Sequence, residues 1–584
     1  METKLSLKAF WNVVEQRLTA CSAEELRAIV RALAQAIPPP QRQAFLDTLQ
    51  PGAATVATEQ REPASETLLA DIDALADQLQ EAQESTEDLV EDDDEDSLGP
   101  YEEFRKSLTV LFERAAMAFD AGNMTLARTA YHNLFEVLGR ADDSGRGVRA
   151  ADLQDVDMSV AQARYLRAVY DTEPLAHRPA VLCDAMLQVR AWLPGPRPML
   201  DDIIHIAPPP LADQEQFCRD WVAFLRTQSS RDADAWLREG VYLSQGTAGL
   251  ESLARTEGVQ RPRAYLDWCA ALEGEGQPRA VLAAAQAALR ALPTPLPLRA
   301  AVADYLCTAA LHLHDTAALR AGRWEAFAAK PTLARLLDVW EVTPSGTART
   351  RRMQQAAQHL QHVLAHPPDQ EGLRPAPTQS RQVQGWEDDV ESPVWPAKSV
   401  LAHAYLLAGD WDAAYQLAAP EQVLGWSSSH NTQGLIVSCF LVQMSGISPG
   451  QLPPNLAQLW QWKLQDSTGF VAWHSTDTGE ASLLTRLQHA YTEYLPAPTW
   501  PHDQQADMLT WCLDIAQRRV DAIVSNQHSG SYDKAALLLA ACAELLRLLD
   551  KVQEATTLLD DARQHFASHH AFQTELQAAV RRMG

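Results

Sequence analysis

The sequence has few of the features on which disulfide frameworks, zinc sites and membrane spans depend. Its eight cysteines are scattered, with no C-x-x-C or C-x-C pair, whereas a disulfide framework or a zinc site needs clustered cysteines. The longest apolar stretch, Leu435–Met444, is interrupted by Ser438 and Gln443 and has about half of the ~20 residues that a membrane helix requires. The opening METKLSLKAFW has no apolar signal core. We therefore expect a protein of a reducing compartment, the cytoplasm, with no membrane association.

The sequence also lacks the motifs that usually carry chemistry. No G-x-x-x-x-G-K-[ST], G-x-G-x-x-G, G-x-S-x-G or H-E-x-x-H occurs. The carboxylate pairs Asp388-Asp389 and Asp560-Asp561 lie in linker or surface contexts, without the burial that raises the pKa of a general acid. Histidines at helical spacing occur twice. His565 and His569 have no third ligand nearby, and His359, His362 and His366 are no better supported as a metal site. We predict no cofactor, no metal and no enzymatic activity, and keep an enzyme of undescribed type as an alternative.

The composition predicts an all-α protein. Hydrophobic residues make up 46% of the 584 residues, the commonest types are strong helix formers, and no alternating strand pattern stands out. The chain is too long for one core. The predicted segments are a helical module at 1–50, an acidic linker with one amphipathic helix at 51–100, a helical-repeat domain at 101–340, a proline-rich connection at 341–397 and a C-terminal helical domain at 398–584.

The acidic charge is concentrated in one segment. The net charge is −27, and residues 51–104 hold Arg61 as their only basic residue against eighteen acidic ones. The remainder is mildly acidic, which argues against broad contact with a phosphate backbone. The run Glu84–Asp96 contains nine acids and is expected to be a solvated tether. The alternative is that it binds a basic surface, and 345–366 is the candidate within this chain.

Two amphipathic units are predicted near the start of the chain. Ser22 and Glu25 form a capping box within a small helical unit at 5–49, which is either a docking module or a cap on the main body. Ser65–Glu84 carries a one-sided stripe of leucine and isoleucine on an otherwise acidic helix.

Ser399–Ala419 is the clearest of several predicted helical hairpins. It turns at Gly409-Asp410, with alanines where the helices must approach closely and aromatic residues in the remaining space. Looser copies turn at Gly122-Asn123, near Gly274–Gln277 and at Asp550-Lys551. The hairpins predict an α-solenoid, which offers an extended surface to a partner.

The spacing Ala402-x-x-Tyr405 and Ala414-x-x-x-Ala418 resembles the tetratricopeptide repeat, which implies stacked helical hairpins. Arg518–His528, followed by Ser531–Ala536, is similar to the C-terminal helical region of bacterial SWIM zinc-finger family proteins. Trp324–Val342 resembles the helical stretch ahead of that region in the family. The zinc-binding C-x-C…C-x-H signature of the family is absent here, so its zinc-dependent contacts are not implied.

The candidate partner-binding residues fall in two groups. The first surrounds a predicted turn between two helices and consists of Arg518, Arg519, Tyr532, Asp533 and Lys534; a purely structural turn with paired charges is the alternative. The second is the basic island, with Arg349, Arg351 and Arg352. We predict a non-enzymatic interaction scaffold or accessory subunit of a bacterial complex that binds a protein partner. A nucleic-acid-associated regulator related to the SWIM family is the alternative.

Overall fold

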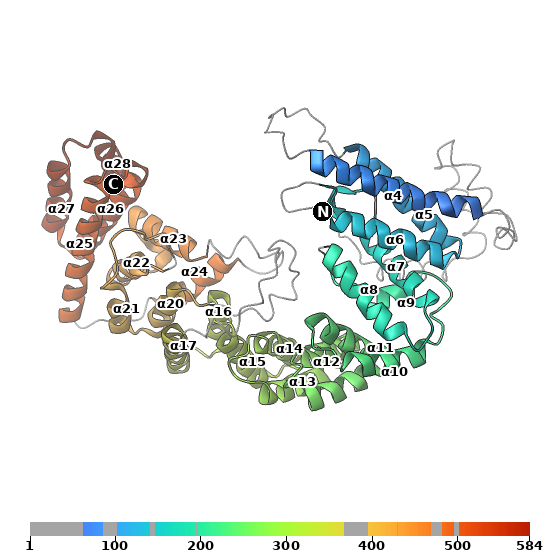
Figure 1. Cartoon of the computed structure of the whole chain (residues 1–584). Coiled ribbons are helices and arrows are strands. Elements are labelled where there is room, and N and C mark those ends of the chain that lie inside the picture. Colours follow the sequence, from blue (N-terminus) through green and yellow to red (C-terminus); the bar gives the residue numbers. More distant parts are fainter. Residues whose placement is uncertain are drawn as a thin grey trace, which may run out of the picture. The chain divides into compact units, whose positions relative to one another are not determined.

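The protein is all-α. The computed structural model describes residues 62–85, 102–140, 147–193, 195–366, 395–428, 430–468, 482–495 and 502–583. These residues form 23 α-helices and a few short 3-10 turns, and they contain no strand, which confirms the all-α prediction (Figure 1). The described residues contain no helix long and apolar enough to cross a membrane. The predicted module at 1–50 and all but the first two residues of the acidic run Glu84–Asp96 lie outside the described residues.

The chain groups into two compact units, which divide between Glu257 and Gly258. The five segments predicted from the sequence remain a prediction. The helices of the first unit are α4 (Glu62–Ser85), α5 (Glu102–Asp120), α6 (Met124–Gly139), α7 (Met158–Thr172), α8 (Arg178–Trp192), α9 (Leu200–His205), α10 (Gln214–Leu225) and α11 (Arg231–Glu257).

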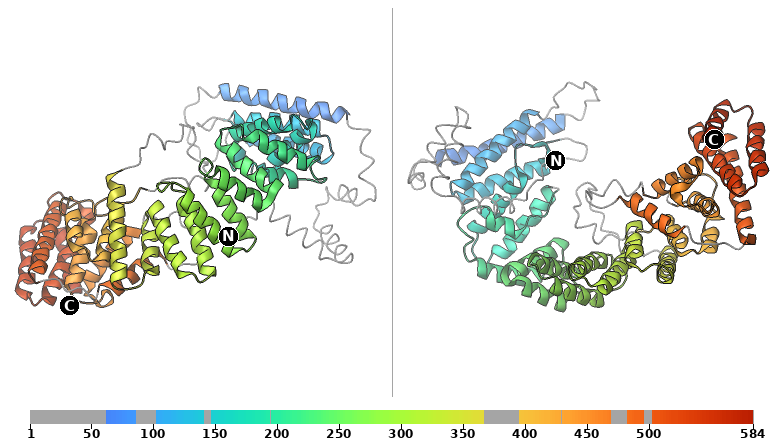
Figure 2. Two further views of the ribbon diagram at one scale, coloured as in Figure 1. Left: turned by 90° about the horizontal axis from the view of Figure 1, so that it is seen from below. Right: turned by 180° about the vertical axis from the view of Figure 1, so that it is seen from behind.

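The amphipathic helix predicted at 65–84 is α4, and it packs onto the first unit. Its apolar stripe, Leu68, Ile72, Leu75 and Leu79, is buried, and α4 contacts both α5 and α6. The left view of Figure 2 shows this helix, in blue, lying along one side of the unit. An ion pair of 2.6 Å between Arg114 and Asp71 ties α5 to the polar face of α4.

The helices of the second unit are α12 (Arg263–Gly274), α13 (Pro278–Ala291), α14 (Arg299–His312), α15 (Thr316–Ala329), α16 (Leu333–Val342), α17 (Thr347–Ala365), α20 (Lys398–Ala408), α21 (Trp411–Ala418), α22 (Gln433–Met444), α23 (Pro454–Thr468), α24 (Leu483–Tyr494), α25 (His502–Val524), α26 (Tyr532–Leu548), α27 (Val552–His565) and α28 (His570–Arg582).

The hairpin predicted at Ser399–Ala419 is confirmed as α20 and α21. Gly409 has a φ of 71°, and the turn closes with hydrogen bonds from Gly409 N–H to the Leu406 carbonyl and from Asp410 N–H to the Tyr405 carbonyl. This pair of bonds satisfies carbonyls that the end of a helix otherwise leaves free, and it requires a left-handed residue after the helix. The Asp410 carboxylate then caps α21 by accepting from Ala413 N–H at 3.2 Å.

The other three predicted hairpins are confirmed and use the same turn. Gly122 after α5, Gly276 after α12 and Asp550 after α26 have φ values of 78°, 68° and 60°. In each turn the following residue donates its N–H to the carbonyl five positions earlier, as in Lys551 to Leu546. His314 and Gln527, also left-handed, close two further turns in this way. The same left-handed turn therefore reverses the chain at six places in the described residues.

Most helices pack against a neighbour in sequence, and several also pack against the second helix along. The pairs α5·α7, α6·α8, α12·α14, α20·α22 and α26·α28 are examples within single units. Helix α17 occupies part of the segment in which the sequence showed little periodicity and a connection was predicted. Its apolar stripe is short, consisting of Met353, Ala356, Ala357 and Leu360, and it packs mainly against α20.

Two helices of the second unit are buried almost all round. Every residue of α22 is buried, and so are thirteen of the residues of α26, from Tyr532 to Leu546. Such helices have no polar face and need neighbours on every side. Helix α26 obtains them from α22, α23, α25, α27 and α28. It is therefore the centre about which the C-terminal helices are arranged.

Candidate functional site: a groove between α25 and α27

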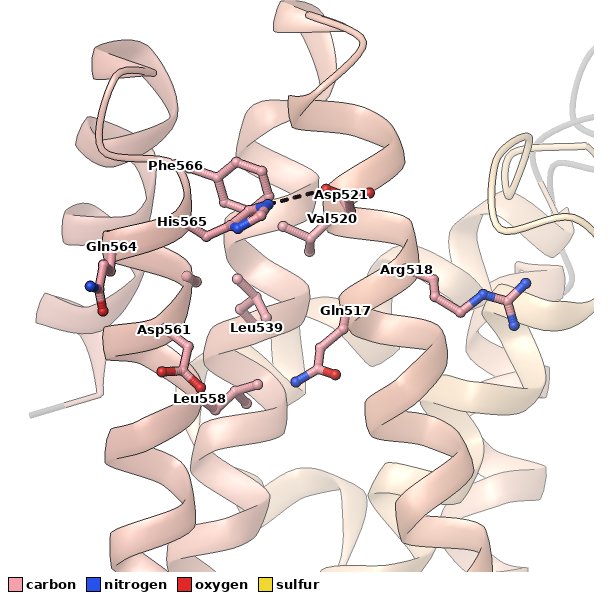
Figure 3. Close-up of a pocket in the computed structure, with 11 residues that line it drawn as sticks. Gln517, Arg518, Val520, Asp521, Leu539, Leu558, Asp561, Gln564, His565 and Phe566 are labelled. Atoms are coloured by element: carbon pink, nitrogen blue, oxygen red, sulfur yellow. Dashed lines mark ion pairs between the residues drawn. The ribbon is translucent and has the colours of Figure 1, made fainter.

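A groove lies where α25 and α27 flank α26. Both flanking helices pack against α26, and the space between them has a volume of about 740 Å³. Figure 3 shows α26 behind this space, with α25 and α27 at its two sides. The groove is of the size that binding sites for ligands and peptide side chains usually have.

The floor of the groove is apolar and its rim is polar. The floor is formed by Val520 of α25, Leu539 of α26, Leu558 and Ala562 of α27, and Phe566. The rim is formed by Gln517, Arg518 and Asp521 of α25 and by Asp561, Gln564 and His565 of α27. This arrangement follows from the helical period of α27, because Ala555, Leu558, Leu559 and Ala562 are buried against α26 and leave the next positions at the edge.

One ion pair crosses the groove. His565 Nε2 lies 3.5 Å from Asp521 Oδ1, and this pair joins α27 to α25 at one end of the groove (Figure 3). Asp521 also accepts from the Ser525 hydroxyl at 2.9 Å. Asp561, by contrast, is exposed and makes no hydrogen bond or ion pair with any residue that the structure describes. The rim therefore carries a carboxylate that is open to a partner.

The predicted residues Arg518 and Arg519 point in different directions. Arg518 is exposed on the rim, pairs with Asp514 at 3.3 Å and points away from the groove (Figure 3). Arg519 is buried: its guanidinium lies 4.1 Å from the centre of the Trp426 ring and donates to the Val423 carbonyl. Burial lowers the pKa of Arg519 to about 10. Arg519 is therefore a structural residue and is not accessible to a partner.

The three predicted residues at the start of α26 are also separated. Tyr532 is buried edge-on against Phe572 of α28, with ring centres 6.0 Å apart. Asp533 is exposed in the first turn of α26, where a negative charge is favoured. Lys534 Nζ lies 5.2 Å from the Trp462 ring. Tyr532 therefore packs between helices, as the structural alternative expects, and of these three residues only Asp533 is exposed.

Sequence reasoning missed a buried lysine beside Arg519. Lys463 of α23 is 1% exposed, donates to Asp466 at 2.7 Å and to the Trp426 carbonyl at 3.2 Å, and lies 3.6 Å from the centre of the Trp462 ring. Burial lowers the pKa of Lys463 to about 8. The indole faces, one carboxylate and the carbonyl together hold this cation. The signal available in the sequence was Trp460-Gln461-Trp462-Lys463, in which a cation follows two indoles.

The predicted basic island is only partly a surface. Arg349 stacks on Trp340 at 4.5 Å and pairs with Glu493 at 2.6 Å. Arg352 lies 4.8 Å from the Trp324 ring. Arg351 is exposed and has no partner within the described part of the chain. A second, smaller groove of about 340 Å³ adjoins Arg349, between α16, α17 and α24.

Most of the potential nucleophiles and bases considered among the described residues are buried in the core. Seven cysteines are buried and unpaired, and Cys21 lies outside the described residues. Burial raises the pKa of Cys183 to about 11 and that of Cys269 to about 12, which keeps these thiols protonated. Burial likewise raises the pKa of Glu239 to about 7, but this carboxylate accepts from the N–H groups of Leu200 and Asp201 and so caps α9.

His403 is the most deeply buried base. It is fully buried in α20, its Nδ1 lies 2.8 Å from the Tyr491 hydroxyl, and its Nε2 has no hydrogen-bond partner. Burial lowers the pKa of His403 to about 3. None of the grooves described above includes His403 in its lining. No group of three or more His, Cys, Asp or Glu residues that could hold a metal ion occurs in the described ranges.

The sequence matches no model of a known protein family, and no curated protein matches it significantly.

Proposed function

We propose that this chain is an interaction scaffold, or an accessory subunit of a larger complex, that binds a protein partner in the groove between α25 and α27. The observation that carries the proposal is the groove itself. Its apolar floor is bounded by a polar rim and opens to solvent, while the thiols and His403 are buried elsewhere. An interface needs an apolar centre within a polar edge.

We further propose that the hairpins belong to a degenerate tetratricopeptide-like α-solenoid. The support is local. The same left-handed turn recurs at Gly122, Gly276, Gly409 and Asp550, and contacts between every second helix recur within each unit. The relation to the SWIM family remains a proposal that rests on the quoted residues of α25, α26 and 324–342.

A nucleic-acid function has less support. Of the three arginines of the basic island, Arg349 is engaged with Glu493 and Trp340, and Arg352 lies against Trp324. Counterion release requires several cations free to meet phosphates, and Arg351 alone meets that condition in this island.

The test compares two bulky substitutions on exposed positions. Gln517→Trp places an indole in the groove, and Thr556→Trp places one on the exposed face of α27 away from it. Full-length wild type and both variants are isolated from native cells, and the bound proteins are quantified. A stoichiometric partner that is retained by wild type and Thr556→Trp and lost from Gln517→Trp supports the proposal. A partner retained equally by all three, or no stoichiometric partner, contradicts it.

A further inference from the structure

The geometry points to the kind of partner that the groove takes: we propose an amphipathic helix that carries a basic residue beside its apolar face. This inference rests on the proposed function and adds the chemistry of the partner. It is carried by the length of the groove, its all-helical walls and the charges on its rim.

The length of the groove suits two helical turns. The floor runs along α27 from Leu558 to Phe566, a span of about 12 Å at a rise of ~1.5 Å per residue. Apolar side chains at positions i, i+3 or i+4, and i+7 of a partner helix extend over about 10 Å on the same scale. Such a helix can place its apolar stripe along the whole floor.

The walls favour a helix over an extended peptide. A peptide that binds as a strand relies on the free edge of a sheet for its backbone hydrogen bonds, and the helices around this groove satisfy their own backbone groups. A helical partner brings its backbone hydrogen bonds with it. Laid over α26 between α25 and α27, it packs by the same side-chain ridges that join those helices.

The rim charges favour a basic partner. The groove-lining residues include one arginine and two aspartates, and that arginine, Arg518, points away and pairs with Asp514 outside the groove. Asp521 faces His565 across the groove, while Asp561 lies between Leu558 and Phe566 along α27 and has no partner in the described structure. A lysine or arginine next to the partner's central apolar side chain therefore meets Asp561.

The test uses three designed, fluorescently labelled peptides and the full-length chain. The first is a leucine–lysine peptide of helical period, the second replaces lysine with glutamate, and the third is the first peptide with a central proline. Binding is measured by fluorescence anisotropy to wild type, Asp561→Asn, Asp560→Asn and Gln517→Trp. Asp560 is the matched control, because it adjoins Asp561, is exposed, pairs with Arg563 and does not line the groove.

We expect the leucine–lysine peptide to bind wild type and Asp560→Asn equally, and Asp561→Asn about fivefold more weakly, as for the loss of one exposed charge pair. Gln517→Trp should abolish binding, and circular dichroism checks that it stays folded. If the glutamate peptide binds as tightly as the lysine peptide, or if the two Asn variants have equal effects, the inference that the partner is basic is wrong. If the proline peptide binds as tightly as the first peptide, the inference that the partner is helical is wrong.

Three further outcomes separate this inference from the proposed function. If no designed peptide binds, but a native partner is lost on Gln517→Trp, the inference about the partner's chemistry fails and the proposed function stands. If the chain self-associates in sedimentation and Gln517→Trp abolishes this, a second copy occupies the groove and the inference fails. If native partners bind Gln517→Trp as well as they bind wild type, the proposed function is wrong.

Discussion

Replacing His403 with asparagine should remove much of the acid sensitivity of the second unit. The imidazole is fully buried, has one partner in Tyr491, and has a pKa lowered to about 3. In the unfolded chain the pKa of His403 is near 6.5, so below that pH the unfolded state binds a proton that the folded state does not bind. Above pH 6.5 the imidazole is neutral in both states and does not oppose folding. As the pH falls from 6.5 toward 3, protonation of the unfolded state progressively lowers the free energy of unfolding.

The size of the effect follows from the two pKa values. At pH 5 the unfolded state gains about 2 kcal/mol from protonating His403, at ~1.4 kcal/mol per pH unit over about 1.5 units. Asparagine keeps an oxygen to accept from the Tyr491 hydroxyl and does not titrate. The small cavity that it leaves destabilises α20 by the same amount at both pH values.

The assay is native-state hydrogen exchange of the full chain, read in peptides of α20 and corrected for intrinsic rates at pH 7 and pH 5. Wild type should lose about 2 kcal/mol more protection between these pH values than His403→Asn. His430→Asn, at an exposed position in the same unit, should behave as wild type. An equal pH dependence for wild type and His403→Asn would refute the reasoning.

Four further predictions concern turns and buried groups. Gly409→Ala should lower the free energy of unfolding by more than about 1 kcal/mol, because φ is 71° and the new Cβ would clash with the Tyr494 hydroxyl. Gln527→Gly, at a left-handed residue in the same kind of turn, should raise the free energy of unfolding by about 0.5–1 kcal/mol. Chemical denaturation measures both, and an increase for Gly409→Ala or a decrease for Gln527→Gly would contradict the turn argument. The pKa of Lys463 is about 8 in the folded state and near 10.5 in the unfolded state, so at neutral pH the unfolded state binds the proton more tightly. This preference weakens as the pH rises. The free energy of unfolding of wild type should therefore increase by about 1 kcal/mol from pH 7 to pH 9, and that of Lys463→Met should not. In a Cys21→Ser background, an aromatic disulfide reagent should modify the seven buried thiols only as fast as the protein opens, and rapid modification in native buffer would disprove their burial.

The hairpins were predictable from the sequence because their turns depend on local chemistry. A glycine followed by a capping aspartate or asparagine, as in Gly409-Asp410 and Gly122-Asn123, indicates a left-handed helix end and a new helix start within one dipeptide. Helix α17 was harder to predict, because Ala356 and Ala357 contribute little to an apolar stripe in a segment rich in arginine, glutamine and histidine. Its burial depends on α20, which is distant in the sequence.

The candidate site shows the same limit. Arg518 and Arg519 are adjacent in sequence, but one residue turns a helix by about 100°, so one reaches the rim and the other the core. Arg519 falls on the buried face of α25 with Ile515 and Ile523, and its contact with Trp426, which comes from another part of the chain, could not be predicted from α25 alone. The groove was not predictable for a similar reason, because it is a space left between α25 and α27 by their shared packing on α26.

The central claim, that a partner helix occupies the groove, is tested most directly by a photo-crosslinking amino acid placed at Gln517 in the full chain in native cells. We expect one dominant adduct, to a partner segment with apolar residues at helical spacing and an adjacent lysine or arginine. The same reagent at Thr556 should give no such adduct. Equal adducts at the two positions, or a dominant adduct to an acidic or extended segment, would contradict the account.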